Sequence, residues 1–288
     1  PSPAPGRAGA SRTTIARRAA VTSFFGAHRG EWRDRYREAS FYAYNYQTRG
    51  EIALRLLDSV SRRQDSRLLE LGCGAGIQAE AASRLGWPVT ATDLTLPLLH
   101  QAKDSVQGPR WAAAAAEYLP FGPGSFHGVM MLGVIGYVSD PPAVLQALHS
   151  VIEPGGFLVI SCATADPLLD RVSRAVSVVP DAIYLGIKRL VTGGSAKAEA
   201  PEEGGGFYLR FNRYWGLGGF RTVLARNGFR LERVQGVNFG KLRFMGKATW
   251  SDRGDIRVSR ALERASAGPG MGWLTGGART LVGLAWKV

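Results

Sequence analysis

The fold is decided by one short stretch of the chain, Leu68-Leu69-Glu70-Leu71-Gly72-Cys73-Gly74-Ala75-Gly76. Its first half is apolar enough for a short buried strand over residues 67–71, and residues 77–85 that follow have the pattern of a helix. The glycines let the backbone turn sharply and approach a ligand, because side chains there would be strained or in the way. The free amides at the start of the helix suit an anionic group, so the stretch predicts a ligand-binding strand–loop–helix unit.

A carboxylate ends the next predicted strand, residues 88–93. From that position Asp93 can accept both hydrogen bonds of a ribose diol, which predicts a nucleoside in the ligand. The glycine spacing is Gly-x-Gly-x-Gly, and Ile77 stands where a dinucleotide fingerprint would have its third glycine. The spacing therefore argues against a dinucleotide.

Strands and helices alternate through the rest of the chain. We expect further strands at 111–115, 126–132, 157–162, 229–237 and 280–288, and helices at 140–152, 219–227 and near 256–265. This order predicts an α/β fold, a doubly wound, Rossmann-like sheet of seven strands with N-terminal helices. Its ligand would lie at the carboxyl ends of the strands.

The chain is expected to divide into a disordered tail (1–22), an N-terminal helical cap (23–66), a ligand-binding Rossmann-like core (67–165), a lid insertion (166–216) and the C-terminal part of the sheet (217–288) with a basic insertion (238–275). The tail contains Pro, Ala, Ser, Thr and four Arg but no acid, a composition typical of disorder or of the end of an organelle transit peptide. A long insertion after the fifth strand would cover the ligand cleft as a lid.

The net charge of +13 at pH 7 is carried by the two flanks of the chain. Residues 67–166 contain four basic and eight acidic side chains, whereas residues 201–288 contain fifteen basic and six acidic ones. Such basicity fits an anionic substrate, a phospholipid surface or nucleic acid, and it fits a solvated arginine-rich surface equally well.

The two cysteines, Cys73 and Cys162, are too few for a disulfide framework. They predict free thiols and a cytoplasmic location, with a plastid or other organelle as the alternative if residues 1–22 are the remnant of a transit peptide. No apolar run reaches the roughly 18–20 residues of a membrane-spanning helix. No His/Cys cluster has metal-ligand spacing, so no metal site is expected.

Four stretches, in order along the chain, make residues 67–163 resemble the core of the class I S-adenosylmethionine-dependent methyltransferases. They are the glycine turn, Asp93-Leu94-Thr95 with Leu98-Leu99, residues 116–121 and residues 153–156. The similarity is greatest to the small-molecule branch that includes the ubiquinone and menaquinone biosynthesis methyltransferases. The resemblance implies that the cofactor is S-adenosylmethionine and that residues 67–165 bind it.

The resemblance also implies a role for each matching residue. The glycine turn and Glu70 would line the methionine part of the donor, and Asp93 would hold the ribose hydroxyls. Two leucines would enclose the adenine, two residues after the third strand would meet its edge, and the end of the fourth strand would contact the methionine amine. The full set is Glu70, Gly72, Cys73, Gly74, Gly76, Asp93, Leu94, Leu98, Ala116, Glu117, Leu132 and Gly133.

One position departs from the family. Its members commonly have an aspartate at Ala115 that hydrogen-bonds the adenine amino group. Losing one such bond would cost about 1 kcal/mol, or less if water or Glu117 replaced it. We therefore expect weaker donor binding rather than loss of function.

The expected function is methyl transfer to a small, largely apolar acceptor, on oxygen, carbon or nitrogen. Methyl transfer depends largely on positioning and desolvation, so the absence of an evident catalytic dyad is consistent with it. Aromatic residues that could form the acceptor pocket, or could equally serve packing, are Tyr42, Tyr46, Tyr137, Phe207, Tyr214 and Trp215.

No catalytic residue is identified. The four histidines, any of which could be a general base, are more simply surface or packing residues: His28, His100, His127 and His149.

Two other functions stay open. The first is a membrane-associated lipid or quinone methyltransferase that contacts an anionic bilayer through Lys241, Arg243, Lys247, Arg253, Arg257 and Arg260. The second is a non-enzymatic scaffold that binds S-adenosylmethionine; Ala115 is the only residue that supports this alternative.

Nucleic acid is not expected as a partner, because no recognised RNA-binding motif accompanies the positive charge. Asp140-Pro141-Pro142-Ala143 lacks the aromatic fourth residue of the base-methylating enzymes, so it is interpreted as a helix start capped by Asp140.

Overall fold

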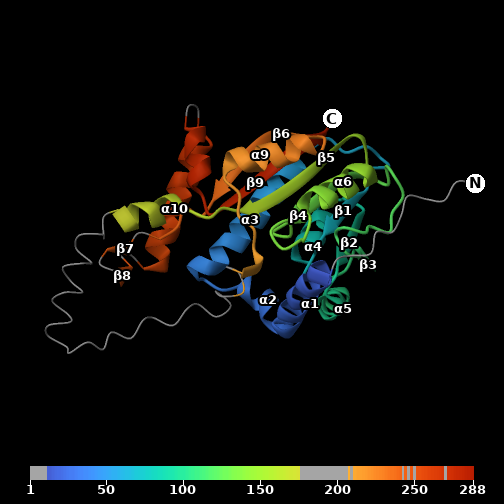
Figure 1. The fold of residues 1–288 in the computed structure, drawn as a ribbon, viewed down its shortest axis with the longest axis horizontal. Coiled ribbons are helices and arrows are strands. Elements are labelled where there is room, and N and C mark those ends of the chain that lie inside the picture. The colour runs from blue at the N-terminus through green and yellow to red at the C-terminus, as the bar shows by residue number, and fades with distance from the viewer. Residues whose placement is uncertain are drawn as a thin grey trace, which may run out of the picture.

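The computed structural model describes residues 12–175, 207, 210–241, 243–244, 247–248, 251–268 and 271–288. These residues form a seven-stranded sheet with helices on both faces (Figure 1). The strand order is β3-β2-β1-β4-β5-β9-β6, in which β9 runs antiparallel to both of its neighbours and the other pairs are parallel. The expected doubly wound, Rossmann-like α/β fold is confirmed.

The strands lie where the alternation predicted them. They are β1 (Leu68–Leu71), β2 (Val89–Asp93), β3 (Arg110–Ala113), β4 (Phe126–Leu132), β5 (Ile152–Ala163), β6 (Phe229–Val237) and β9 (Thr280–Lys287), with a small hairpin of β7 (Arg243–Phe244) and β8 (Lys247–Ala248). The largest difference is the start of β5, which was expected at residue 157. Ile152 already pairs with Phe126, ahead of a register shift in the ladder, so the predicted turn at 153–156 lies within the strand.

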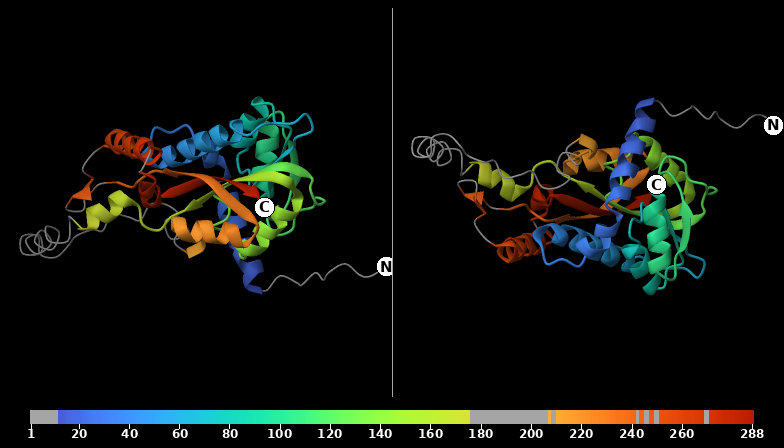
Figure 2. Two further views of the ribbon diagram at one scale, coloured as in Figure 1. Left: turned by 90° about the horizontal axis from the view of Figure 1, so that it is seen from above. Right: turned by 90° about the horizontal axis from the view of Figure 1, so that it is seen from below.

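The helices form two layers on the sheet. One face carries α3 (Phe41–Asp58), α4 (Ile77–Arg84) and α5 (Leu96–Ser105), and the other carries α6 (Pro141–Val151) and α9 (Leu217–Arg226) (Figure 2). The N-terminal helices are α1 (Arg12–Ala27) and α2 (Arg29–Arg35). Between β8 and β9 lie α10 (Asp252–Ser266), which packs against α3, and the 3₁₀ helix η1 (Gly272–Gly277). Residues 168–175 are also helical.

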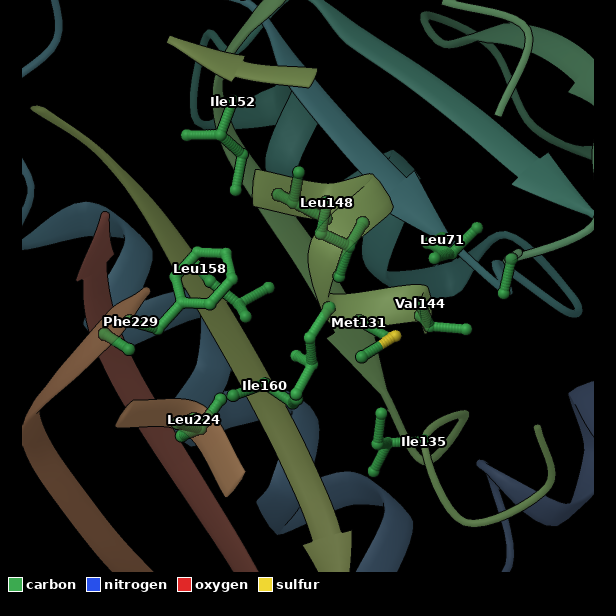
Figure 3. Packing of buried hydrophobic residues seen from close by; sticks show 14 of the residues in the cluster. Leu71, Met131, Ile135, Val144, Leu148, Ile152, Leu158, Ile160, Leu224 and Phe229 are labelled. Carbon is green, nitrogen blue, oxygen red and sulfur yellow. The ribbon is translucent and has the colours of Figure 1, made fainter. Parts of the chain in front are cut away.

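The core lies between the sheet and these two layers. Leu158 and Ile160 of β5 meet Leu148 of α6 and Leu224 of α9 on one face (Figure 3). Each of these side chains is fully buried, and burying one stabilises the fold by roughly 1.5–3 kcal/mol. The opposite face has a second apolar cluster beneath α3 and α4. Because both faces of β5 are covered here, its residues 157–160 form a continuous apolar run.

Asp140 caps α6, as expected. Its Oδ1 accepts a hydrogen bond from the backbone amide of Ala143 at 3.1 Å, and Pro141 occupies the first turn, where no amide hydrogen is needed. This arrangement explains the Asp-Pro-Pro sequence as a helix start.

The disordered tail expected over residues 1–22 is wrong for residues 12–22, which belong to α1. Arg17 ties this helix to the protein: its guanidinium donates to the carbonyl oxygens of Tyr137 at 2.9 Å, Gly136 at 3.2 Å and Phe211. Helix α1 also packs against α5. The composition of this segment is typical of disorder. The contacts of Arg17 join residues that are far apart in the sequence, so no local sequence pattern indicated that the segment is held in place. Residues 1–11 lie outside the described part.

The lid predicted at 166–216 falls largely on residues 176–206 and 208–209, which lie outside the described part, so the lid stays a prediction. Among the residues that are described, no helix is both long enough and apolar enough to cross a bilayer.

Candidate functional site

A cavity of about 850 Å³ lies at the carboxyl edge of the sheet. The loops that follow β1, β2, β3, β4 and β5 all contribute to its wall, and side chains of α1 and α3 cover it. This edge is where doubly wound sheets bind their ligands. The volume falls in the range of roughly 300–1,000 Å³ typical of small-molecule sites.

The glycine turn forms the floor of the cavity. Gly72 has a φ of 74°, and a Cβ there would lie 2.2 Å from a methyl group of Val134, so no larger residue fits. Gly74 has a φ of 51°, and a Cβ there would meet nothing within 4 Å. Gly74 therefore leaves open space for a ligand to approach the backbone.

Gly76 has a different role from the one expected. It does not line the cavity; it precedes α4 with a φ of 74°, and a Cβ there would lie 2.8 Å from the ring of Trp111. Gly76 is thus required for packing between the helix start and β3. The other eleven residues expected to bind the donor all line the cavity.

Asp93 is fixed by two backbone amides. Its Oδ2 accepts a hydrogen bond from Gly74 at 2.9 Å and its Oδ1 accepts one from Thr95 at 2.7 Å. Burial raises the pKa of Asp93, and the hydrogen bonds from Thr95 and Gly74 oppose that rise. Smaller contributions from the Thr95 side chain and the Leu94 amide act in the same direction, and Asp93 lines the cavity.

A carboxyl group and a guanidinium line the part of the cavity beside Gly133. Burial, together with the charge of Asp93, raises the pKa of Glu70 to about 8, and Arg49 of α3 opposes the rise. Arg49 reaches over the loop after β4, where a Cβ on Gly133 would lie 2.4 Å from its Nη1. Within the described part of the chain, Glu70 Oε2 is buried without a hydrogen-bond partner. A carboxyl group and a guanidinium in one pocket fit the ammonium and carboxylate of an amino acid.

The other end of the donor region lies after β3. Leu94, Leu98 and Ala116 form an apolar wall there, and Glu117 reaches the cavity beside them. Glu117 forms an ion pair with Arg18 of α1 at 3.1 Å. The sequence contained no signal for Arg18, because residues 1–22 were interpreted as a disordered tail.

The aromatic residues proposed for the acceptor divide into two groups. Tyr42, Tyr46, Tyr137 and Tyr214 line the cavity, and the hydroxyls of Tyr42 and Tyr46 are 2.8 Å apart. Phe207 and Trp215 do not line it. Phe207 stacks on Phe24 of α1 with ring centroids 3.8 Å apart, and Trp215 packs against the core beneath α6 and α9.

Four polar residues that sequence reasoning did not select also line this end of the cavity: Asn45, Asp170, Asn212 and Arg279. Arg279 Nη2 donates to Asp170 Oδ2 at 2.7 Å. None of the four histidines is a lining residue. His127 lies at the opposite edge of the sheet, where its Nδ1 contacts Glu153, so it is placed for packing and pairing.

Residues 69–160 match the family model described as a methyltransferase domain. Among curated proteins, the ubiquinone biosynthesis O-methyltransferase of Xanthomonas campestris is 36% identical over 119 residues, which cover 38% of this chain and 50% of that protein. The protein of the same name from Xanthomonas oryzae is 35% identical over the same length, with the same coverage of both chains. The chain thus spans about half the length of the curated relatives it matches.

Solved structures share the fold over almost the whole chain. A possible histamine N-methyltransferase from Thermotoga maritima has a TM-score of 0.55 at 15% identity, covering 92% of this chain and 99% of that one. The magnesium protoporphyrin IX methyltransferase of Synechocystis, solved with bound SAH, has a TM-score of 0.54 at 13% identity, covering 94% and 99%. At such low identity, the likeness concerns the fold alone.

These findings agree with the geometry of the cavity. Residues 69–160 form a core that is similar in sequence to a methyltransferase domain, and the chain shares its fold with solved S-adenosylmethionine-dependent methyltransferases. The curated relatives that it matches over this core are named for O-methylation in ubiquinone biosynthesis.

Proposed function

We propose that this protein transfers a methyl group from S-adenosylmethionine to a small, largely apolar acceptor. The observation that carries the proposal is that one cavity contains both the glycine turn with Asp93 and a wall of tyrosines. A donor bound over the turn would therefore share an enclosed space with its acceptor. Such closeness, away from water, provides much of the catalysis of a displacement reaction.

The donor residues would work as follows. Asp93 would accept the ribose hydroxyls, and Gly74 would allow the ligand to pass close to the backbone. Arg49 would receive the carboxylate of the methionine part. Glu70, which is protonated near neutral pH in the ligand-free protein, would ionise opposite the ammonium, because a nearby positive charge favours the carboxylate form. When bound, the donor supplies an activated methyl group on a sulfonium.

The acceptor would lie between the tyrosines. Tyr42, Tyr46, Tyr137 and Tyr214 offer flat, mainly apolar surfaces, which suit an aromatic or otherwise apolar molecule. The relatives named as O-methyltransferases favour a hydroxyl oxygen as the nucleophile. No histidine lines the cavity, so we propose that a weakly acidic hydroxyl, such as that of a phenol or catechol, loses its proton to solvent. The resulting phenolate oxygen then takes the methyl group, and the sulfonium leaves as the neutral thioether S-adenosylhomocysteine.

The test begins with donor binding and then measures transfer. Calorimetry with S-adenosylhomocysteine should show binding, and radiolabelled S-adenosylmethionine should pass its methyl group to members of a panel of alkyl-substituted phenols and catechols. Tyr137→Ala should raise KM for the acceptor at least about tenfold while leaving the Kd of S-adenosylhomocysteine unchanged. If no donor binds at millimolar concentration, the enzyme proposal fails. Donor binding without transfer to any class of acceptor would favour the scaffold alternative.

A second candidate function, peripheral binding to an anionic membrane, is favoured by the charge on α10. Arg253, Arg257, Arg260 and Arg264 are all exposed and recur at spacings of three and four, which place them on one side of the helix. Trp273 of the neighbouring η1 is 68% exposed. Lys241, also expected in this surface, is instead paired with Asp252 at 2.9 Å and lies over the ring of Phe41.

The membrane candidate has its own test. Vesicles with a third of anionic lipid should carry the protein upward in a flotation gradient at low salt, and neutral vesicles should not. Replacing Arg253, Arg257 and Arg264 by Gln together should abolish flotation, because each basic group near the surface contributes about 1 kcal/mol. Replacing the exposed Arg221 and Arg226 of α9, on the opposite layer, together with the exposed Arg230 of the edge strand β6, is the matched control. Absence of flotation at low salt would eliminate this candidate.

The cytoplasm remains our proposed location, since both cysteines are free thiols.

A further inference from the structure

The order of the strands in the sheet indicates the direction in which a bound donor would extend along the cavity. The loops that line the cavity belong to β4, β1, β2 and β3, which are consecutive neighbours in the sheet. Adjacent strands lie about 4.8 Å apart, so these loops span about 14 Å in a row. With the amino-acid end of the ligand near Gly133 and the ribose near Asp93, its base must lie beyond Asp93, over the loop that follows β3.

That loop contains an unsatisfied buried oxygen. The side chain of Glu117 is only 9% exposed, and it lines the cavity. Its Oε1 is fully buried and, within the described part of the chain, has no hydrogen-bond partner. A buried carboxylate oxygen without a partner is costly, which indicates that a donor group from a ligand completes the site.

Arg18 of α1 holds the other oxygen of the same carboxylate. Arg18 Nη2 lies 3.1 Å from Glu117 Oε2, and its guanidinium carbon lies 5.1 Å from the centre of the Tyr118 ring. The ion pair limits the rotation of Glu117, so that Oε1 stays directed to one place. Ala115, with its methyl side chain, can offer no acceptor at this end of the site.

We propose that Glu117 Oε1 accepts a hydrogen bond from the exocyclic amino group of the donor's adenine, and that Arg18 is the positioning residue for Glu117. The inference rests on the proposed function, since it assumes S-adenosylmethionine in the cavity. It makes α1 part of the donor site, because the helix supplies the group that orients the base-recognising carboxylate.

The test compares two ligands that differ at the base alone. Calorimetry gives Kd for S-adenosylhomocysteine and for its deaminated analogue S-inosylhomocysteine, in which a carbonyl oxygen replaces the amino group. The native protein should prefer the adenine ligand by at least about tenfold, because the carbonyl would face Glu117 Oε1 as a second acceptor. In Glu117→Ala the preference should fall to about twofold or less, mainly through weaker binding of the adenine ligand.

Conservative variants separate recognition from folding. Glu117→Gln keeps an acceptor oxygen and should retain part of the preference. Arg18→Gln should reduce the preference while Arg18→Lys preserves most of it, although neither change removes an acceptor. Glu232→Gln, an exposed carboxylate on β6, is the matched control and should behave as the native protein does.

Each outcome has a defined meaning. A preference that survives in Glu117→Ala, or an equal loss of affinity for both ligands, overturns the inference and leaves the proposed function intact. If the native protein binds neither ligand at millimolar concentration, the proposed function fails as well. The two failures are therefore distinguishable in one set of titrations.

Discussion

Asp93 Oδ2 accepts a hydrogen bond from the backbone amide of Gly74 at 2.9 Å, so the carboxylate that ends β2 holds the glycine turn that ends β1. Thr95 fixes the second oxygen at 2.7 Å. Both oxygens are already oriented in the protein itself. A ligand that uses Asp93 would therefore bind a preorganised group and would lose little binding energy to ordering it.

Asp93→Asn should weaken both the turn and donor binding. Asparagine has one acceptor oxygen, so its NH₂ group would face the backbone N–H of either Gly74 or Thr95. We expect the free energy of unfolding to fall by about 1–3 kcal/mol and the Kd for S-adenosylhomocysteine to rise about 10- to 100-fold. Urea unfolding and calorimetry measure the two effects. Asp58→Asn, at the exposed end of α3, is the control. An unchanged stability of Asp93→Asn would contradict the stabilising role of the hydrogen bonds between Asp93 and the amides of Gly74 and Thr95.

Glu70 should make stability depend on pH. Its pKa is about 8 in the folded protein against an ordinary value of 4.5, so the folded state keeps a proton that the unfolded state has already released between those values. The free energy of unfolding should therefore decline as the pH rises from 4.5 to about 8 and then level off. Glu70→Gln cannot titrate and should lack this part of the decline, which we expect to amount to about 3–5 kcal/mol.

The measurement is urea unfolding of native and Glu70→Gln protein at a series of pH values from 4.5 to 8.5. The difference between the two curves isolates Glu70, because all other groups titrate in both proteins. Glu232→Gln should follow the native curve, since that carboxylate is exposed. Parallel curves for native and Glu70→Gln protein would show that Glu70 is ionised in the fold throughout this range.

Arg17→Gln should loosen α1. The native guanidinium donates to the carbonyl oxygens of Gly136, Tyr137 and Phe211, and a glutamine is too short to reach all three. Amide hydrogen exchange in residues 12–27 should accelerate at least about tenfold, while exchange in α3 stays the same. Arg29→Gln, which alters an exposed arginine bonded only to nearby Gly26 among the described contacts, provides the comparison. Equal exchange in all three proteins would mean that α1 is held by its other contacts.

Asp140→Ala should destabilise the protein by about 1 kcal/mol through the loss of its cap on α6. Ser251 provides a matched control: it occupies the same position before α10, but its side chain makes no capping hydrogen bond. Ser251→Ala should therefore change the unfolding midpoint much less. The prediction would be wrong if the two substitutions had equal effects in urea.

The features that the sequence predicted are those with a local pattern. The expected bounds of β4 and β6 agree with the structure because β4 is a largely apolar run and β6 mixes apolar with polar residues directly after the turn at Asn227-Gly228. Asp93 and the glycine turn were recognisable for the same reason, since their chemistry depends on residues at fixed short spacings. The start of β5 was missed because the glycines at 155–156, typical of a turn, are accommodated inside the strand.

The rest depends on residues that meet only in the folded chain. Nothing near Arg18 in the sequence indicates that it reaches Glu117, and a composition without acids made the whole segment look disordered. Gly76 was grouped with Gly72 and Gly74, which line the cavity, although its own neighbour in space is Trp111. Phe207 and Trp215 had the residue type of a pocket wall, but Phe207 stacks on Phe24 behind the lining residues Phe25 and Tyr137, and Trp215 packs against the core.

The position of β9 has a consequence for how the protein is made. Residues 280–287 are inserted between β5 and β6 and pair with both, so a strand near the end of the chain lies inside the sheet. During synthesis β6 has no partner in this sheet until those residues have left the ribosome. Until then, the edge of β5 stays open to wrong partners, a hazard that chaperones limit. Completion of the sheet therefore waits until residues 280–287 have been synthesised.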